Sequence, residues 1–352
     1  MSSPEGIAVV GGPVVAELPR RASLRLRCAH WLSRATLRRF FDLAVWIDEH
    51  GLLTPGQSMF VARWLETVVA PLRPARGTRL RRIAFENFRA EWVWDDASGL
   101  PGEGDEPAAI LYFHGGGFVS CGLNTHRRMV ARIARVAGSP LLQVDYRQIP
   151  QAHITETIDD CVAAYGYLLD LGIPAERIIV MGDSAGGGLA FAMALAARTR
   201  SLPMPAGIVA ISPWADYDST HRRAHPNDQL DALLGADAYA LPVKWGIMRG
   251  GRLDPMWSPV NHDFTGLPPV LIQVGSTEVL VADVELLAAR CAAAAVPVQV
   301  QIWDSAFHVF QVAADVLPDA RQAIGDIGAF VRAVLDTAGA HRREVRAEKA
   351  LA

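Results

Sequence analysis

The sequence predicts an α/β fold in which a parallel sheet carries helices on both faces. The first observation is an alternation from residue 108 onward, in which short apolar runs are followed by longer segments of helical composition. These helical segments are 124–138, 156–172 and 185–200. The second observation is that glycine-rich turns directly follow two of the apolar runs. Strands that alternate with helices favour a parallel sheet, because each crossover helix returns the chain to the same end of the sheet.

The individual strands are expected from short apolar runs. Residues 82–96 are typical of an antiparallel hairpin that opens the sheet, and 110–113 and 177–181 are typical of buried parallel strands. Residues 267–274 and 296–303 follow later in the chain. The last of these segments alternates apolar and polar residues, which predicts a half-exposed edge strand.

Four segments are expected along the chain. Residues 1–75 form an N-terminal helical segment, and residues 215–250 interrupt the strand–helix alternation. The main domain then comprises 76–214 and 251–340, and the charged end, 341–352, is a flexible tail. A chain of 352 residues is long enough for one large α/β domain with an accessory lobe.

Charge and composition exclude several classes of partner. The net charge of −3 argues against a nucleic-acid partner. The cysteines Cys28, Cys121, Cys161 and Cys291 show neither a C-x-x-C motif nor a metal-binding spacing. No signal-peptide pattern opens the chain, and no apolar run is long enough to span a membrane. We therefore expect a cytoplasmic protein with reduced thiols, no metal and no organic cofactor.

A candidate nucleophile lies in the turn Gly182-Asp183-Ser184-Ala185-Gly186. This is the pattern G-x-S-x-G between a buried strand and a long helix without proline. Such a turn presents the serine hydroxyl on a tight bend, and the flanking glycines prevent collisions with neighbouring strands. The alternative is a glycine-rich turn with an incidental serine.

A second glycine-rich turn supplies candidate hydrogen-bond donors. His114-Gly115-Gly116-Gly117 follows the strand 110–113 at once, and consecutive glycines leave backbone N–H groups unshielded. We predict an oxyanion hole formed by the N–H groups of Gly115, Gly116 and Ala185. His114 is expected to support the loop by hydrogen bonds. A phosphate-binding loop is excluded because no Lys-Ser/Thr pair follows the glycines.

Taken together, these motifs resemble the bacterial hormone-sensitive-lipase-like carboxylesterases (family IV) of the α/β-hydrolase superfamily. The two glycine-rich turns occur in the family's order, and Asp145-Tyr146-Arg147, Ser212-Pro213-Trp214 and the segment 254–259 also agree. The resemblance spans residues 82–335. It implies an α/β-hydrolase fold with a mostly parallel sheet of eight strands, and a helical cap built from 1–75 and 215–250.

The resemblance also implies a catalytic triad in the order Ser, Asp or Glu, His. His308 is the candidate base, because it lies downstream of Ser184 in the loop after the strand 296–303. Glu278 follows the strand 267–274 and is the candidate acid, with Asp283 as the alternative. Asp283 is otherwise expected to support the first turn of a helix.

Residues near the expected strand ends are candidates for the substrate pocket and for supporting positions. The pocket candidates are Phe118, Val119, Trp214, Met256, Trp257 and Phe307, although each could equally be plain core. The supporting candidates are His114, Asp183, Asp254 and Asp283. Large rings reduce pocket volume, so we expect short- to medium-chain esters as substrates.

Two other functions stay open. The same residues could cleave an amide, a carbamate or a lactone. A catalytically silent receptor that binds a small molecule beneath its cap would be expected to lose the base, whereas this chain has a candidate for every triad position.

A basic segment near the N-terminus is the last feature of the sequence. Seven arginines between residues 20 and 39 are interleaved with leucines, Trp31, Phe40 and Phe41. This pattern fits a cap helix with arginines in water, and it also fits a weak peripheral contact with anionic lipid. The cap interpretation is favoured. A homodimer is a further partner that the sequence leaves open.

Overall fold

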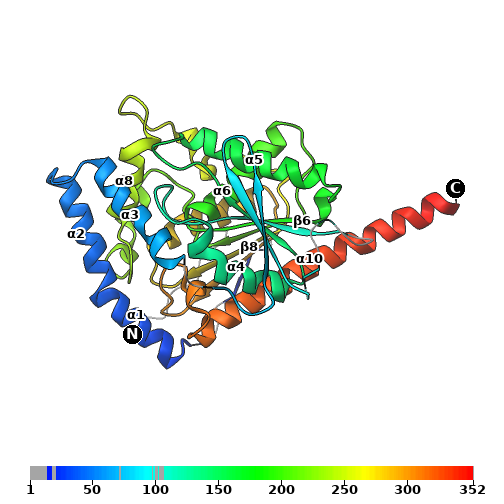
Figure 1. The fold of residues 1–352 in the computed structure, drawn as a ribbon, viewed down its shortest axis with the longest axis horizontal. Helices are drawn as coiled ribbons and strands as arrows, with labels where there is room; N and C mark the ends of the chain where they lie inside the picture. The colour runs from blue at the N-terminus through cyan, green and yellow to red at the C-terminus, as the bar shows by residue number, and fades with distance from the viewer. Residues whose placement is uncertain are drawn as a thin grey trace.

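The computed structural model describes residues 14–17, 21–70, 73–96, 98–99, 102 and 107–351. At its centre is one sheet of nine strands in the order β1-β9-β8-β7-β6-β4-β5-β3-β2, with helices on both faces (Figure 1). The expected eight-stranded, mostly parallel sheet is present as β2 to β9, and β1 adds a ninth strand at one edge.

The strands are β1 Val14–Glu17, β2 Arg79–Ala84, β3 Arg89–Trp94, β4 Ala109–Phe113, β5 Leu141–Asp145, β6 Ile178–Asp183, β7 Gly207–Ile211, β8 Val270–Gly275 and β9 Val298–Trp303. Strands β2, β3, β4, β6, β8 and β9 lie close to segments that the sequence predicts, whereas β1 lies within the segment 1–75 that is predicted to be helical. Strands β2 and β3 form the predicted antiparallel hairpin, and β3 pairs antiparallel with β5. All other pairs are parallel. The carboxyl ends of β4, β6 and β8 therefore lie at the same end of the sheet, along the strand direction.

The prediction that 296–303 forms an edge strand is wrong. Strand β1 pairs with the outer side of β9, with Val14 opposite Val298. The polar residues of β9 are also less exposed than the alternation suggests. Gln301 is buried, and its side-chain oxygen accepts a hydrogen bond from Gln273 Nε2 at 2.8 Å, which offsets the cost of burying the amide.

Side chains of the central strands point alternately into two cores. Leu111 and Phe113 of β4 belong to one apolar cluster, and Ile110 and Tyr112 belong to the other. This two-residue period is the geometry of a strand that is buried on both faces, which explains why the sequence of β4 is apolar throughout.

Helices cover both faces of the sheet. The helices are α1 Leu24–Ala35, α2 Leu37–Glu49, α3 Pro55–Val69, α4 Leu123–Ala137, α5 Ile154–Asp170, α6 Ala185–Thr199, α7 Thr220–Ala224, α8 Ala236–Pro242, α9 Val281–Ala293 and α10 Pro318–Leu351. Short 3₁₀ or π segments lie at Ala175–Arg177, Pro226–Asp228, Val243–Ile247, Pro255–Trp257, Pro259–Asn261 and Phe310–Ala313. Residues of α5, α6 and α9 pack into one core, and residues of α4 and α10 pack into the other.

The N-terminal helices contact the insertion between β7 and β8. The carboxylate of Asp48 on α2 accepts hydrogen bonds from Lys244 Nζ at 2.7 Å and Trp245 Nε1 at 2.8 Å. Arg38 donates to the carbonyl oxygens of Asp228 and Asp231. Figure 1 shows α1, α2, α3 and α8 gathered on one side of the molecule. The two segments expected to form a cap therefore touch, and their exact boundaries stay a prediction.

The end of the chain is helical as far as Leu351, and the flexibility expected for residues 341–352 stays a prediction. Helix α10 continues to Leu351 and projects away from the body of the molecule (Figure 1). The physical reason is composition: residues 340–351 are dominated by alanine, arginine, glutamate and lysine, which have high helix propensity, and contain neither glycine nor proline.

Candidate active site

Ser184 occupies a sharp turn between β6 and α6. Its backbone has φ 51° and ψ −122°, a strained conformation for a residue with a side chain. The glycines at positions 182 and 186 are required because a Cβ at Gly182 would fall on the carbonyl of Gly186, and one at Gly186 on the carbonyl of Phe113. The turn therefore presses close against β4 and holds the serine hydroxyl at the carboxyl end of the sheet.

Three side chains from distant parts of the chain form one hydrogen-bonded row. His308 Nε2 lies 2.9 Å from Ser184 Oγ, and His308 Nδ1 lies 2.7 Å from Glu278 Oε2. Glu278 follows β8, and His308 lies in the loop after β9. All three residues are buried. This row can transfer a proton from a hydroxyl to an imidazole whose other nitrogen is held by a carboxylate.

Glu278 is held by more than His308. Its Oε1 accepts hydrogen bonds from Gly275 N at 2.6 Å and from Ser212 Oγ at 2.7 Å. With both oxygens occupied, the carboxylate cannot rotate freely, and its second oxygen stays directed at the imidazole. The orientation of His308 is therefore fixed before any substrate binds.

Asp283, the alternative acid, is directed elsewhere. Its Oδ1 forms a fully buried ion pair with Arg222 at 2.7 Å, and its Oδ2 accepts hydrogen bonds from the backbone N–H groups of Ala215 and Asp216. All of its described contacts join α9 to the segment after β7. The structure brings Glu278, and not Asp283, to the imidazole.

The electrostatic environment of His308 favours its charged form. Burial by itself lowers the pKa of His308, but the hydrogen bond to Glu278 and the negative charge of Glu278 outweigh it and hold the pKa above the ordinary value of 6.5. A base must be neutral to accept a proton, so this shift moves the loss of activity on acidification to higher pH.

We expect ester hydrolysis to fall as the pH decreases through a value above 6.5, where His308 becomes protonated. In Glu278→Gln the negative charge is lost, so the inflection of the residual activity should move to lower pH. The measurement is the dependence of kcat/KM on pH in both proteins. An inflection at the same pH in both would contradict the assigned role of Glu278.

The predicted oxyanion hole needs one correction. Gly115 N donates to Asp183 Oδ1 at 3.0 Å, so this N–H already has an acceptor. A side chain at Gly115 would also collide with Asp183. Among the described hydrogen bonds, none uses the N–H groups of Gly116, Gly117 or Ala185. The sequence alone does not show which of three adjacent glycines directs its N–H toward Asp183, so it places Gly115 in the predicted oxyanion hole.

A buried polar network centred on Asp183 holds the glycine-rich loop 114–117 in place. Besides the hydrogen bond from Gly115 N, the Asp183 carboxylate accepts a hydrogen bond from Tyr112 Oη at 2.7 Å. It also lies 3.1 Å from His126 Nε2. Burial lowers the pKa of His126, but the charge of Asp183, its hydrogen bond and smaller contributions from Gly122 and Glu66 together outweigh burial and raise the pKa above 6.5, so His126 and Asp183 favour an ion pair. Asp183, expected only as a supporting residue, thereby ties the loop after β4 to the start of α4.

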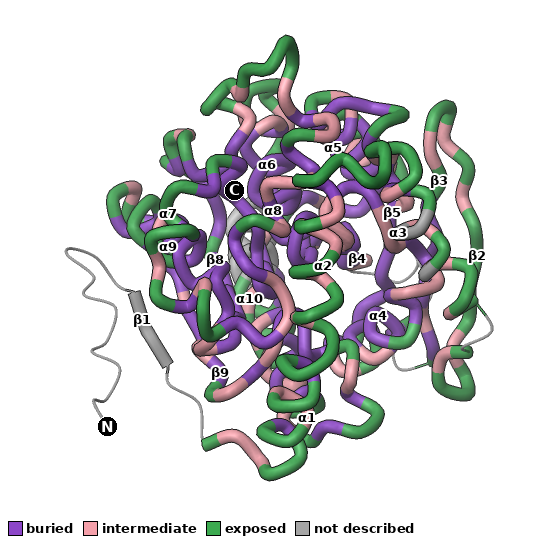
Figure 2. Tube along the Cα trace, turned by 90° about the vertical axis from the view of Figure 1, so that its left-hand side faces the viewer, coloured by how far each residue is buried: buried purple, intermediate pink, exposed green. Residues whose placement is uncertain are grey.

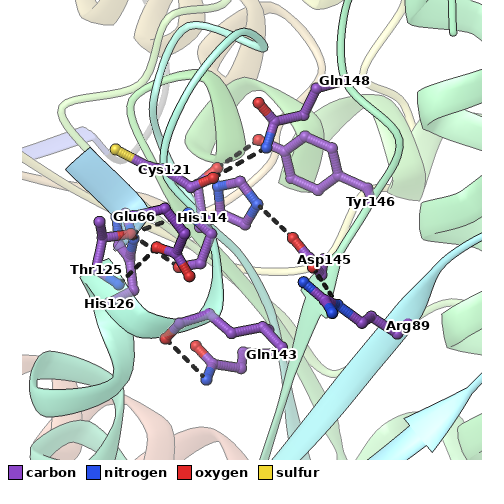
Figure 3. Close-up of polar contacts among 12 residues, drawn as sticks. Glu66, Arg89, His114, Cys121, Thr125, His126, Gln143, Asp145, Tyr146 and Gln148 are labelled. Carbon is purple, nitrogen blue, oxygen red and sulfur yellow. Dashed lines mark hydrogen bonds and ion pairs between the residues drawn. The ribbon is translucent and has the colours of Figure 1, made fainter. Parts of the chain in front are cut away.

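His114 supports the same loop from the other side. Its Nδ1 lies 2.7 Å from the carbonyl oxygen of Gly115, and its ring stacks on Tyr146 with the centroids 4.4 Å apart. Figure 3 shows His114 beside Tyr146 and joined by a dashed line to Asp145, with His126 and Thr125 nearby. Burial lowers the pKa of His114, which favours the neutral ring.

The N-terminal segment reaches this network through Glu66 of α3. Its carboxylate oxygens accept hydrogen bonds from Asn124 N at 2.7 Å and Thr125 N at 2.9 Å, at the first turn of α4 (Figure 3). Thr125 Oγ1 in turn lies 2.9 Å from His126 Nδ1. A carboxylate at a helix N-terminus is favourable because it accepts hydrogen bonds from the free N–H groups and is attracted by the positive end of the helix dipole.

Comparison with known proteins agrees with this architecture. Residues 110–312 match the alpha/beta hydrolase fold family. This chain belongs to that family. The hydrolase is 42% identical over 293 residues to Esterase LipU of Mycobacterium tuberculosis. The aligned residues cover 80% of this chain and 97% of LipU. It is 38% identical over 251 residues to an acetyl-hydrolase of Streptomyces hygroscopicus, covering 71% and 81% of the two chains.

Solved structures narrow the relationship. A crystal structure of EstE5 soaked with p-nitrophenyl butyrate superposes with a TM-score of 0.75 at 31% identity, covering 90% of the hydrolase and 100% of EstE5. An esterase from the bacterial hormone-sensitive lipase family gives a TM-score of 0.73 at 33% identity, covering 88% and 97%. The predicted relationship to the hormone-sensitive-lipase-like carboxylesterases is confirmed.

The pocket candidates of the hydrolase separate into two groups. Phe118 and Trp214 are fully buried, and their rings lie 5.4 Å apart at the centre of an aromatic cluster with Tyr217. Val119 is also buried, and Phe307 is half-buried. The sequence interpretation missed Tyr239 of α8, whose ring lies 6.2 Å from the ring of His308. No pattern in the sequence of α8 marks this tyrosine.

Three other candidates, Asp254, Met256 and Trp257, have described contacts only outside the row of Ser184, His308 and Glu278. Asp254 caps its own turn through a 2.9 Å hydrogen bond from Met256 N, and Met256 is 52% exposed. Trp257 packs edge-on against His153 with centroids 4.5 Å apart. These contacts indicate a local turn and give no direct link from Asp254 to Ser184, Glu278 or His308.

We expect Asp183→Ala to lower kcat of the hydrolase by about 10- to 100-fold with a smaller change in KM, because Gly115 N loses its acceptor and the loop donors shift. Asp183→Asn is the matched control. It keeps an oxygen for Gly115 and Tyr112 and should lose less activity. Steady-state kinetics with a p-nitrophenyl ester measure both. An Asp183→Ala enzyme with unchanged kcat would show that the network does not position the loop.

Proposed function

We propose that this esterase cleaves short- to medium-chain carboxylic esters through an acyl-enzyme, with Ser184, His308 and Glu278 as its catalytic triad. The observation that carries the proposal is the hydrogen-bonded row from Ser184 Oγ through His308 to Glu278, with distances of 2.9 and 2.7 Å. Membership of the hormone-sensitive-lipase-like esterases supports the reaction type.

The mechanism follows from the roles of these groups. His308 Nε2 accepts the proton of Ser184 Oγ as the oxygen attacks the ester carbonyl, and Glu278 stabilises the imidazolium that forms. The N–H groups of Gly116, Gly117 and Ala185 receive the negative charge on the carbonyl oxygen. His308 then donates its proton to the leaving alcohol, and water hydrolyses the acyl-enzyme by the same steps.

The preference for small acyl groups is supported by the aromatic side chains around the site. Phe118, Trp214, Tyr217 and Tyr239 are all buried and in ring contact, so they occupy volume that a long acyl chain would need. Short acyl chains are also favoured by the names of three relatives, an acetyl-hydrolase, an ethyl acetate hydrolase and an acetyl esterase.

Hydrolysis of p-nitrophenyl esters from acetate to palmitate tests the substrate preference. We expect kcat/KM to be highest with short or medium acyl chains and to fall steeply for long ones. A maximum at twelve carbons or longer would contradict the preference while leaving the triad unaffected.

The alternatives are weaker but have separate tests. An amide or lactone hydrolase would use the same side chains, and comparing amide, lactone and ester substrates of equal acyl group distinguishes them. A silent receptor is disfavoured because the structure brings all three triad candidates into hydrogen-bond contact.

The location of the protein remains part of the proposal. Among the described residues, no helix combines the length and the apolar character that crossing a bilayer requires. The four cysteines are free thiols, which favours a reducing, cytoplasmic compartment.

A further inference from the structure

Exposed apolar side chains are concentrated on the three N-terminal helices and on the short segment between α2 and α3. Twelve of the eighteen large apolar residues that are exposed in the described chain lie between positions 24 and 68. They are Leu24, Trp31, Leu32, Leu37, Phe40, Leu43, Trp46, Leu52, Leu53, Phe60, Trp64 and Val68, and we call them the N-terminal apolar face. Single exposed apolar residues are ordinary, whereas a concentration of this kind marks a surface that is covered in function.

The packing of α2 explains why its apolar residues remain outside. Arg38 and Asp48 face the insertion and bind its backbone and side chains. At 100° per residue, Phe40, Leu43 and Trp46 then lie on the remaining side of the helix. Figure 2 shows α1 and α2 at the front of the molecule with mostly exposed residues. These apolar residues therefore do not serve the contact between α2 and the insertion.

Helix α3 repeats this arrangement. Arg63 donates to the carbonyl oxygen of Ile149 at 2.8 Å, and Glu66 binds the first turn of α4, so one side of α3 is fixed on the main domain. Phe60, Trp64 and Val68 recur every four residues along another side, and Phe60 is 73% exposed. Helices α2 and α3 thus carry apolar stripes that their described contacts with the rest of the chain do not use, and α1 adds the exposed Leu24, Trp31 and Leu32.

Positive charge accompanies this face. Residues 21–41 contain six arginines and neither aspartate nor glutamate, although the whole chain has a net charge of −3. Arg21, Arg27 and Arg39 are exposed. No acidic partner of these three is found among the described ion pairs. An anionic surface would therefore meet both free cations and exposed rings.

A second copy of the chain fits this face less well. Two copies related by a twofold axis would bring the same patch together from both sides, and arginines would then face arginines. A bilayer with anionic headgroups has the opposite charge and accepts tryptophan and phenylalanine rings at the level of its headgroups. Charge complementarity thus selects the lipid surface.

We propose that the N-terminal apolar face and the exposed arginines of α1 and α2 dock this protein on the surface of an anionic bilayer. The contact is peripheral: the rings enter the headgroup region, and Arg27 and Arg39 pair with lipid phosphates. Because α2 packs on α8, and α8 carries Tyr239 beside His308, docking places the active-site side of the molecule next to the lipid.

Flotation with vesicles tests the proposal without relying on activity. The full-length protein should float at low salt with vesicles of phosphatidylcholine and phosphatidylglycerol, and much less with phosphatidylcholine alone or at high salt. The double variant Arg27→Glu/Arg39→Glu should bind these vesicles at least about tenfold more weakly than the wild type. The triple variant Phe40→Ser/Trp46→Ser/Trp64→Ser should also remain in the bottom fraction of the gradient instead of floating with the vesicles.

The matched control replaces exposed apolar residues on other elements, Leu80→Ser/Leu171→Ser, and should float like the wild type. Circular dichroism and thermal melting confirm that each variant is folded. Failure of the wild type to float, or equal flotation of the charge-reversed variant, would overturn the proposal. A wild-type dimer in light scattering that the triple variant converts to monomer, with no flotation, would assign this face to a second copy instead.

Discussion

Replacing Ser184 by alanine is expected to lower kcat/KM for a p-nitrophenyl ester by about 10⁴-fold or more. The change removes the only atom that can attack the ester carbonyl in the proposed mechanism. It leaves the turn intact, because the flanking glycines provide the close contacts with β4 and the serine hydroxyl bonds only to His308 in the described contacts. Thermal melting should therefore be nearly unchanged.

The neighbouring hydroxyl of Ser212 provides the control. It donates to Glu278 Oε1 at 2.7 Å but is separated from the reacting atoms by the carboxylate, so Ser212→Ala should reduce activity much less than Ser184→Ala. If Ser184→Ala kept activity comparable to the wild type, Ser184 would not be the nucleophile, whatever the geometry of the row.

Substitution of the two candidate acids should give opposite phenotypes. Glu278→Gln is expected to lower kcat by about 10³- to 10⁴-fold, because a neutral amide can no longer stabilise the imidazolium of His308. Asp283→Ala should instead destabilise the fold by about 3–5 kcal/mol, because it leaves Arg222 charged, buried and unpaired. Its properly folded fraction should retain kcat.

Active-site titration combined with urea unfolding separates these effects. The titration counts competent sites, and the unfolding curve reports the free energy of unfolding. A fully stable Asp283→Ala protein with abolished kcat, beside an active Glu278→Gln protein, would reverse the assignment of the acid.

Much of the fold follows from local sequence patterns. Strand β4 and helix α6 are predictable because uniform apolar runs and alanine-rich segments correspond to buried strands and helices. Ser184 is predictable because the pattern G-x-S-x-G around it lies within one short segment between an apolar run and an alanine-rich run. The contact that makes Gly186 necessary, with the carbonyl of Phe113 on β4, is visible only in the structure.

The features that the sequence could not predict depend on long-range partners. Gly115 was assigned to the oxyanion hole because nothing nearby reveals that Asp183, 68 residues away, accepts its N–H. The outer side of β9 seemed open because its partner, β1, lies near the other end of the chain.

The central claim is that the imidazole of His308 activates the hydroxyl of Ser184. Peptide mapping by mass spectrometry after reaction with a fluorophosphonate tests it most directly. We predict one adduct, on Ser184, whose rate of formation falls by orders of magnitude in His308→Ala. An unlabelled, folded wild type, an adduct on another serine, or an unchanged labelling rate in His308→Ala would contradict the claim.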